Sequence, residues 1–261
     1  LWGQQYPHSI GLFYSAMTKR VGLKPMEEEY ILMGMAAYGR DLSSVLINHR
    51  FVEDLTEVKF KENLHLGVDD SFLDGFTDMD IAAGTQAVAQ DLIYSVMRRA
   101  RDFGWSTNLV YQGGVALNCL ANQHLGQFFD KIWIMPNPGD SGSSLGAAAL
   151  AMGGPINFNN AYLGHDIPGE YPVNSILDHL LTSRIVGVAS GRAEFGPRAL
   201  GNRSLLADPR GNDIKDRVNE IKRRQRFRPF APVILDELAE QFFHMPLGWR
   251  HSPYMQSVAY C

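Results

Sequence analysis

The chain of 261 residues has only two cysteines, Cys119 and Cys261, and it lacks long apolar runs. Two cysteines exclude a disulfide framework and a four-cysteine zinc site. No stretch approaches the roughly 20 consecutive apolar residues that span a bilayer, and no leader of basic, apolar and small residues opens the sequence. We therefore expect a globular protein of the reducing cytoplasm that has no membrane partner.

An excess of basic residues is also missing, since the net charge is −4 at pH 7. This balance argues against wholesale binding to nucleic acids or membrane surfaces. The segment 184–228 is the exception, because it holds twelve Lys or Arg and five Asp or Glu, and so half of the 24 basic residues. Apolar residues such as Val186 and Leu205 are interleaved with these cations, which favours a folded anion-binding pocket over a polar tail.

Several arginines of this segment lie beside residues that restrict the backbone. Gly196 and Pro197 precede Arg198, and Pro229 follows Arg228. A restricted backbone reduces the freedom that is lost when a planar guanidinium binds phosphate or carboxylate. The pattern predicts a site for a small anion, although a solvated basic face or a nucleic-acid patch is the commoner meaning of a charge run alone.

The spacing of apolar residues predicts an α/β fold. Strands that alternate with helices pair in parallel through crossover connections, and the middle of the chain has this alternation. The helices are expected at 10–21, 27–37, 79–103, 116–128, 143–151 and 176–181, and the strands at 108–112, 132–135 and 184–189.

Two glycine-rich turns follow the strands in the middle of the chain. Glycine lets a ligand approach the backbone, and the free N–H groups at a helix start attract phosphate. Each turn alone also fits a plain tight turn, and Asp140 fits either a helix cap or a metal ligand. Two such turns together favour a nucleotide-binding cleft. The residues concerned are Gly113, Gly114 and Asn118 in YQGGVALN, and Gly139, Asp140 and Ser141 in NPGDSGSSLGAA.

These two motifs and four others resemble the nodulation-type and antibiotic-type O-carbamoyltransferases (the NodU/CmcH family). The others are YPHSIGLFYSA, EEEYILMGMAAYGR, GRAEFGPRALGNRSLLADPR and FRPFAP, and all occur in family order across nearly the whole chain. The resemblance implies the carboxyl-terminal portion of an actin-like (ASKHA) ATPase domain at 1–158, a linker at 159–181 and the start of a YrdC-like α/β domain at 182–261. It also implies that both ends belong to a longer protein.

In such enzymes ATP and carbamoyl phosphate give carbamoyl adenylate and pyrophosphate at the YrdC-like part. The carbamoyl group then passes to a hydroxyl group of a small-molecule acceptor at the other part. Fixed cations offset the repulsion between the anionic reactants. By motif, the resemblance assigns catalytic roles to Arg198, Lys222 and Arg228. It assigns nucleotide binding to Gly113, Gly114, Asn118, Gly139, Ser141, Arg192, Arg203 and Ser204.

The family also holds an iron ion against the nucleotide phosphates, while Mg²⁺ accompanies ATP. Asp140 matches the family's aspartate ligand, but its HxxxH metal motif is missing from the sequence, so we expect an incomplete metal site. We expect Asp213 to cap a helix over 216–221. Four basic residues are expected on the surface: Arg210, Lys215, Arg217 and Arg224.

Two other functions fit parts of the sequence. A non-catalytic nucleotide- or RNA-binding module, related to the tRNA threonylcarbamoylation proteins, would explain the basic segment. A sugar kinase of the actin-like superfamily would explain the glycine-rich turns but neither GRAEFGPRALG nor FRPFAP. Nucleic acid is not an expected partner of the favoured enzyme, a homodimer is a state to test, and the sequence does not identify the acceptor.

Overall fold

The structure is a computed structural model that describes residues 2–261. Its helices are α1 (Ile10–Arg20), α2 (Glu29–Ala36), α3 (Ser44–Phe51), α4 (Asp78–Asp102), α5 (Cys119–Asn122), α6 (Ser143–Met152), α7 (Val173–Ser183), α8 (Ile214–Ile221) and α9 (Ala239–Phe242). Its strands are β1 (Val52–Asp54), β2 (Lys59–Phe60), β3 (Asn108–Tyr111), β4 (Lys131–Ile134), β5 (Asp166–Ile167), β6 (Ile185–Ala189), β7 (Gly191–Arg192) and β8 (Arg203–Ala207). The fold is therefore mixed α/β, as expected. No helix within residues 2–261 is both long and apolar enough to cross a bilayer.

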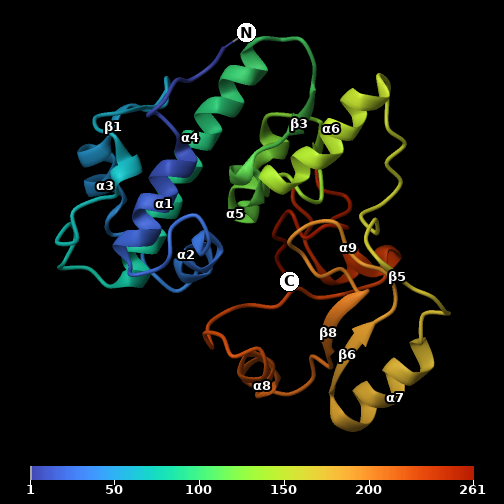
Figure 1. Cartoon of the computed structure of the whole chain (residues 1–261). Coiled ribbons are helices and arrows are strands. Elements are labelled where there is room, and N and C mark those ends of the chain that lie inside the picture. The colour runs from blue at the N-terminus through green and yellow to red at the C-terminus, as the bar shows by residue number, and fades with distance from the viewer. Residues whose placement is uncertain (1) are drawn as a thin grey trace.

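Helix α4 is the centre of the amino-terminal region, where α1, α2 and α3 pack around it (Figure 1). The Thr77 side chain caps the helix by accepting a hydrogen bond from Asp80 N, and two aspartates in its first turn suit the helix dipole. Gly104, at φ 69°, follows its end. Ile81 and Leu92 are fully buried on the face toward the core. The sequence prediction for this helix is confirmed to within a residue at each end.

Strands β3 and β4 pair in parallel, with Asn108 opposite Lys131 and Tyr111 opposite Ile134. This confirms the parallel pairing expected from the alternation of strands and helices. Both carboxyl ends lie at one edge of the sheet, so the two glycine-rich turns start side by side. A second apolar core forms beneath the strands, and its members include Ile93, Leu125 and Ile134.

The predicted helix over 116–128 is wrong. This stretch is broken into a 3₁₀ turn, Gly114–Leu117, the short helix α5 and a second 3₁₀ turn, Leu125–Gln127. Asn118 has the non-helical angles φ −76° and ψ 87°, and its side chain accepts a hydrogen bond from Ala121 N. An asparagine that caps a new helix interrupts the preceding one. Asn118 therefore begins α5 and does not lie inside a longer helix.

The carboxyl-terminal region is built on the antiparallel pair of β6 and β8, on which α7 packs (Figure 1). The chain then returns to the middle region. Gln256 Nε2 donates to the carbonyl oxygens of Ile134 and Met135 at 2.8 and 2.7 Å, and Trp249 Nε1 donates to Asn122 O at 2.8 Å. The segment 245–257 therefore closes over β4, in the region expected to form a separate first domain. The division of the chain at 159 and 182 stays a prediction.

Candidate nucleotide and anion site

The two glycine-rich turns contact each other at the carboxyl ends of β3 and β4. Gly113 N donates to Pro138 O at 2.8 Å, and a Cβ added to Gly139 would lie 4.0 Å from Gly114 Cα. Gly113 has φ 101°, a conformation that favours glycine. The structure thus brings Gly113, Gly114 and Gly139 together, with Gly113 and Gly114 exposed and Gly139 partly exposed.

Asn118 is held by a buried polar network and does not face this surface freely. Its Oδ1 accepts from Ala121 N and from Gln86 Nε2, both at 3.0 Å, and its Nδ2 donates to Gln86 Oε1 at 3.1 Å. Tyr14 Oη donates to the same Gln86 oxygen at 2.9 Å, and burial raises the pKa of Tyr14 well above its usual range. Sequence reasoning missed Gln86, whose polar side chain on the buried face of α4 was the available signal.

In the second turn, Ser141 Oγ donates to Asn137 Oδ1 at 3.0 Å, so this side chain stabilises the turn. The interpretation of Asp140 as a helix cap is wrong, because Gly142 occupies the N-cap position of α6 and no side chain makes a cap hydrogen bond there. The Asp140 side chain is exposed beside the turn. Within residues 2–261, no three His, Cys, Asp or Glu side chains converge as a metal site.

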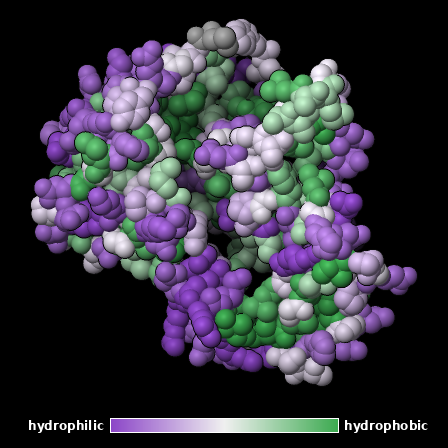
Figure 2. Space-filling view, viewed as in Figure 1, coloured by the Kyte–Doolittle hydropathy of each residue, from purple (hydrophilic) through white to green (hydrophobic). Residues whose placement is uncertain are grey.

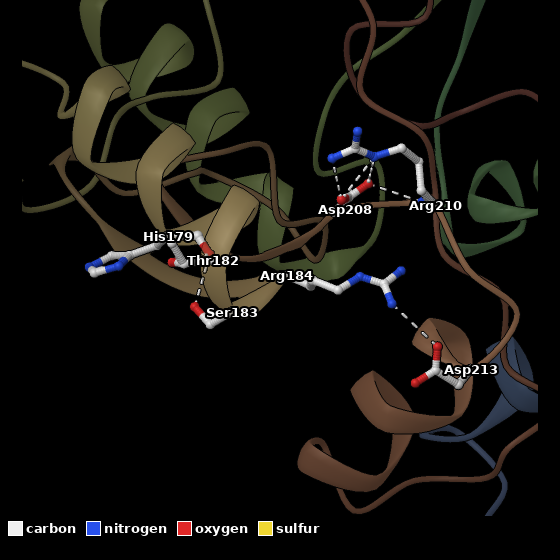
Figure 3. A network of polar contacts seen from close by, with 7 residues as sticks. All are labelled: His179, Thr182, Ser183, Arg184, Asp208, Arg210 and Asp213. Atoms are coloured by element: carbon white, nitrogen blue, oxygen red, sulfur yellow. Dashed lines mark hydrogen bonds and ion pairs between the residues drawn. The ribbon is translucent and has the colours of Figure 1, made fainter.

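Ion pairs and hydrogen bonds of Arg184 and Arg210 fix the loop between β8 and α8 (Figure 3). Asp208 accepts two hydrogen bonds from Arg210 Nε and a third from Arg210 Nη2 at 2.7 Å, and this arginine lowers the pKa of Asp208 to about 2. Asp213 lies 3.5 Å from Arg184 Nη1 and 3.7 Å from Arg217 Nη1. Asp213 occupies the N-cap position of α8, as predicted, but its side chain makes no cap hydrogen bond and its carboxylate pairs with arginines instead.

Three predicted nucleotide-binding residues lie near the β5–β7 pair. The Arg203 guanidinium donates to four carbonyl oxygens, those of Ser190, Asn202, His165 and Gly191, at 2.7–3.1 Å. Most of its donors are therefore occupied by the backbone, and its local role is structural. Ser204 Oγ accepts from Gly201 N at 2.8 Å. Arg192 is exposed and has one long contact, 3.5 Å, to Leu163 O.

Lys222, Arg224 and Arg228 form a group that we call the cation cluster. Burial, and then the charges of Arg224 and Arg228, lower the pKa of Lys222. Asn219 is fully buried beneath it, where Nδ2 donates to the carbonyls of Arg226 and Arg228 and Oδ1 accepts from Arg224 Nε at 2.5 Å. Figure 2 shows a strongly hydrophilic surface at α8 and the loop beside it. Sequence reasoning missed Asn219, which arranges this loop.

The cation cluster lies against helix α2 of the amino-terminal region. The Arg228 guanidinium stacks 4.6 Å from the centre of the Tyr30 ring, and Tyr38 Oη donates to Phe227 O at 2.8 Å. Lys215 Nζ donates to Tyr38 Oη at 2.8 Å. Of the four basic residues predicted on the surface, Lys215 and Arg224 are partly exposed and make contacts there. The surface position is confirmed for Arg210 and Arg217, whose side chains are 73% and 46% exposed.

Arg198 lies apart from Lys222 and Arg228, the other two predicted catalytic residues. Its Nη2 donates to Leu117 O at 3.3 Å, beside the first glycine-rich turn. Gly196, at φ 135°, brings the loop so close that an added Cβ would lie 2.6 Å from Pro136 O. The charges that act on Lys222 come from Arg224 and Arg228. The structure thus joins Lys222 with Arg228 and places Arg198 at the glycine-rich turns.

Glu194 fixes the loop that carries Arg198. Its Oε1 accepts hydrogen bonds from the backbone N–H groups of Leu200, Asn202 and Arg203, at 2.8, 2.9 and 3.2 Å. Burial raises the pKa of Glu194, but the N–H donors outweigh burial and hold it below its usual range. Glu194 is a further residue that sequence reasoning missed, because its partners lie six to nine positions away.

Replacing Glu194 with alanine is expected to lower the free energy of unfolding by about 2 kcal/mol at pH 7. Because its folded-state pKa is lowered, the contribution is complete above the ordinary glutamate pKa of about 4.3. It is lost as the pH falls through the lower folded-state value. Urea denaturation at pH 7 and pH 3 should show the difference from wild type shrinking at pH 3. An equal difference at both pH values would contradict this role.

A cavity of about 680 Å³ lies away from these residues, between β4 and the segment 245–256. Trp133, Leu247 and Tyr254 are among its lining residues. None of the predicted site residues lines this cavity, which is separate from the glycine-rich turns and the cation cluster.

Comparison with known proteins finds two family models that cover most of the chain. The model described as carbamoyltransferase N-terminus matches residues 2–149, and the model described as carbamoyltransferase C-terminus matches residues 177–261. Together they include the glycine-rich turns, the loop 194–203 and the cation cluster.

Curated relatives include the nodulation protein NolO of Bradyrhizobium diazoefficiens, which is 33% identical over 96% of this chain and 53% of its own length. The nodulation protein NolNO of Sinorhizobium fredii is 33% identical over 96% of this chain and 42% of its own length. The nodulation protein U of Rhizobium tropici is 40% identical over 52% of this chain and 26% of its own length. The chain spans about half the length of NolO and NolNO, the two relatives that align with nearly all of it.

Proposed function

The chain belongs to the carbamoyltransferase family, and from this we propose that its protein is an ATP-dependent O-carbamoyltransferase that works through carbamoyl adenylate. The proposal places residues 1–158 in an actin-like (ASKHA) ATPase domain and residues 182–261 in a YrdC-like domain. The acceptor is a hydroxyl group of a small molecule. A homodimer and a cytoplasmic location are part of the same proposal.

The observation that carries this proposal is the presence in one chain of two surfaces whose chemistry suits anions. One is the pair of touching turns, where Gly113 N donates to Pro138 O and exposed backbone can approach a phosphate. The other is the cation cluster, which Asn219 organises from below. Two such surfaces suit a reaction in two steps, in which an adenylate is formed at one and consumed at the other.

In the first step, hydrolysis of carbamoyl phosphate releases carbamate and inorganic phosphate. A carbamate oxygen then attacks the α-phosphorus of ATP, the bond from that phosphorus to the bridging oxygen breaks, and pyrophosphate leaves. Lys222 and Arg228 supply the positive charge that offsets the anionic transition state. In the second step, the acceptor oxygen attacks the carbamoyl carbon, its proton goes to solvent or a base, and AMP leaves.

A metal ion is part of the family's chemistry, and iron and Mg²⁺ are the ions that the proposal includes. Asp140 has an exposed carboxylate beside the second turn, which suits a hard cation. One carboxylate is not a site, and the residues that the structure describes add no second and third ligand. The chain's own residues therefore do not fit a complete metal centre, and no step above depends on one.

Pyrophosphate exchange tests the proposed function. The protein is incubated with ATP, carbamoyl phosphate and labelled pyrophosphate, and label is expected to enter ATP only when carbamoyl phosphate is present. Exchange that does not need carbamoyl phosphate, or no exchange at all, would contradict the adenylate mechanism. RNA binding that weakens steeply with salt, without exchange, would support the non-catalytic nucleotide- or RNA-binding alternative, and a phosphorylated acceptor would support a sugar kinase.

A further inference from the structure

The chain between α6 and α7 is bonded to the loop that joins β7 to β8. Phe195 N donates to Ala161 O at 2.6 Å, and Gly164 N donates to Ala193 O at 2.9 Å. Strand β5 of the same stretch pairs with β7 in the antiparallel direction. The predicted linker over 159–181 therefore includes backbone that is built into the surroundings of this loop.

Two tyrosines of this stretch, which we call the tyrosine pair, reach the middle of the loop. Tyr162 Oη donates to Leu200 O at 2.9 Å, and Tyr171 Oη donates to Gly201 O at 3.0 Å. The two accepting carbonyls are consecutive, so the pair fixes two successive peptide units. These units follow Arg198 almost directly in the sequence, and their orientation therefore affects where the guanidinium lies.

Side chains bind all four backbone polar groups of Leu200 and Gly201. The two N–H groups donate to Glu194 Oε1 and to Ser204 Oγ, both at 2.8 Å, while the two carbonyls accept from the tyrosine pair. These residues lie outside β7 and β8, so no strand neighbour supplies the partners that a backbone needs. Burial, and then the charge of Glu194, raises the pKa of both phenols, which stay protonated donors. Four side chains thus hold one point of the loop.

We propose that Tyr162 and Tyr171 are positioning residues, which hold the loop in the conformation that directs Arg198 at its anion. The inference rests on the proposed function, with Arg198 as a cation of the adenylate-forming step. In this role the tyrosine pair acts through the loop backbone and not on a reactant. Both tyrosines lie between the stretches that the two family models match, 2–149 and 177–261, whereas Arg198 lies inside the second.

Amide hydrogen exchange, followed by mass spectrometry, tests the positioning without an assay of activity. In the double variant Tyr162→Phe/Tyr171→Phe, the amides of 200–203 should exchange about 10-fold faster than in the wild-type protein, because two hydrogen bonds that oppose local opening are lost. The amides of 108–111 should keep their rate, which shows that the fold is intact. Tyr254→Phe is the matched control, since it removes a neighbouring phenol that bonds no backbone of this loop among the described residues.

Pyrophosphate exchange then shows whether the tyrosine pair acts through Arg198. The double variant should exchange label about 10-fold more slowly at saturating ATP and carbamoyl phosphate, because a small misplacement of a catalytic group is costly. In an Arg198→Gln background, which retains Lys222 and Arg228, the same two substitutions should cause almost no further loss. Substitutions that act through one residue are not additive, whereas independent effects are.

Three outcomes would overturn the inference: unchanged amide exchange at 200–203 in the double variant, faster amide exchange with undiminished pyrophosphate exchange, and an equal loss of rate in the wild-type and Arg198→Gln backgrounds. The last would mean that the tyrosine pair supports the protein independently of Arg198. Failure of the proposed function looks different, because the wild-type protein itself would then exchange no pyrophosphate. Unchanged amide exchange, in contrast, contradicts the tyrosine pair alone.

Discussion

Pyrophosphate exchange should fall at least about 100-fold when Arg228 is replaced with glutamine, a loss typical of removing one donor that stabilises transition-state charge. The structure fixes Arg228 through both its backbone and its side chain. Its carbonyl accepts from the buried Asn219, and its guanidinium stacks on Tyr30. Glutamine keeps a polar side chain but cannot supply charge or the bidentate fork.

Three matched variants make this result specific. Arg217→Gln removes an exposed arginine of α8 that makes, among the described residues 2–261, a single ion pair 3.7 Å long, so it should leave exchange nearly unchanged. Arg228→Lys should restore part of the rate, because it restores charge without the planar fork. Asn219→Asp retains the acceptor for Arg224 but loses the two N–H bonds to Arg226 O and Arg228 O, and should impair exchange with Arg228 still present. Full activity of Arg228→Gln would exclude the cluster from the reaction.

The second large effect is expected at Gly126, where the returning segment 245–257 crosses the middle region. A Cβ added to Gly126 would lie 1.8 Å from Leu247 O, and this oxygen is backbone that cannot rotate away. Gly126→Ala should lower the free energy of unfolding by about 3 kcal/mol, at the upper end of the usual cost of overpacking. It should also release the segment, which limited proteolysis would detect as early cleavage near Trp249.

Gly146→Ala is the matched control. Gly146 lies inside α6, and an added Cβ would meet nothing within 4 Å. This substitution should raise the free energy of unfolding by about 0.5–1 kcal/mol, because alanine favours the helix. Thermal unfolding of both variants tests the pair, and equal melting temperatures would show that the close approach at Gly126 is not maintained in solution.

The success and failure of the sequence predictions have local causes. Helix α4 was predictable because its apolar stripe, the Thr77 cap and Gly104 agree with one another. The stretch after Gly114 has the same apolar spacing, but Asn118 forms a cap there, and spacing does not show whether an asparagine side chain will bond to its own backbone.

The site could be predicted only in part for a related reason. Glycine-rich turns after successive parallel strands meet by topology, so their contact follows from the strand order. The separation of Arg198 from Arg228 does not follow from sequence, because thirty residues of loop, strand and helix decide which region each guanidinium faces. The anchors Glu194 and Asn219 bind backbone atoms of loops with no repeating pattern.

Helix α2 contacts the cation cluster and also α5, the helix that follows the first glycine-rich turn. Tyr30 lies under Arg228, and Met33, three residues later on the same helix, has its Sδ 3.9 Å from Cys119 Sγ. Residues three apart are neighbours on a helix surface, so we expect a shift of α2 caused by a ligand at one surface to reach the other. Occupancy of the two surfaces should then obey thermodynamic linkage, in which each ligand alters the affinity for the other by the same factor.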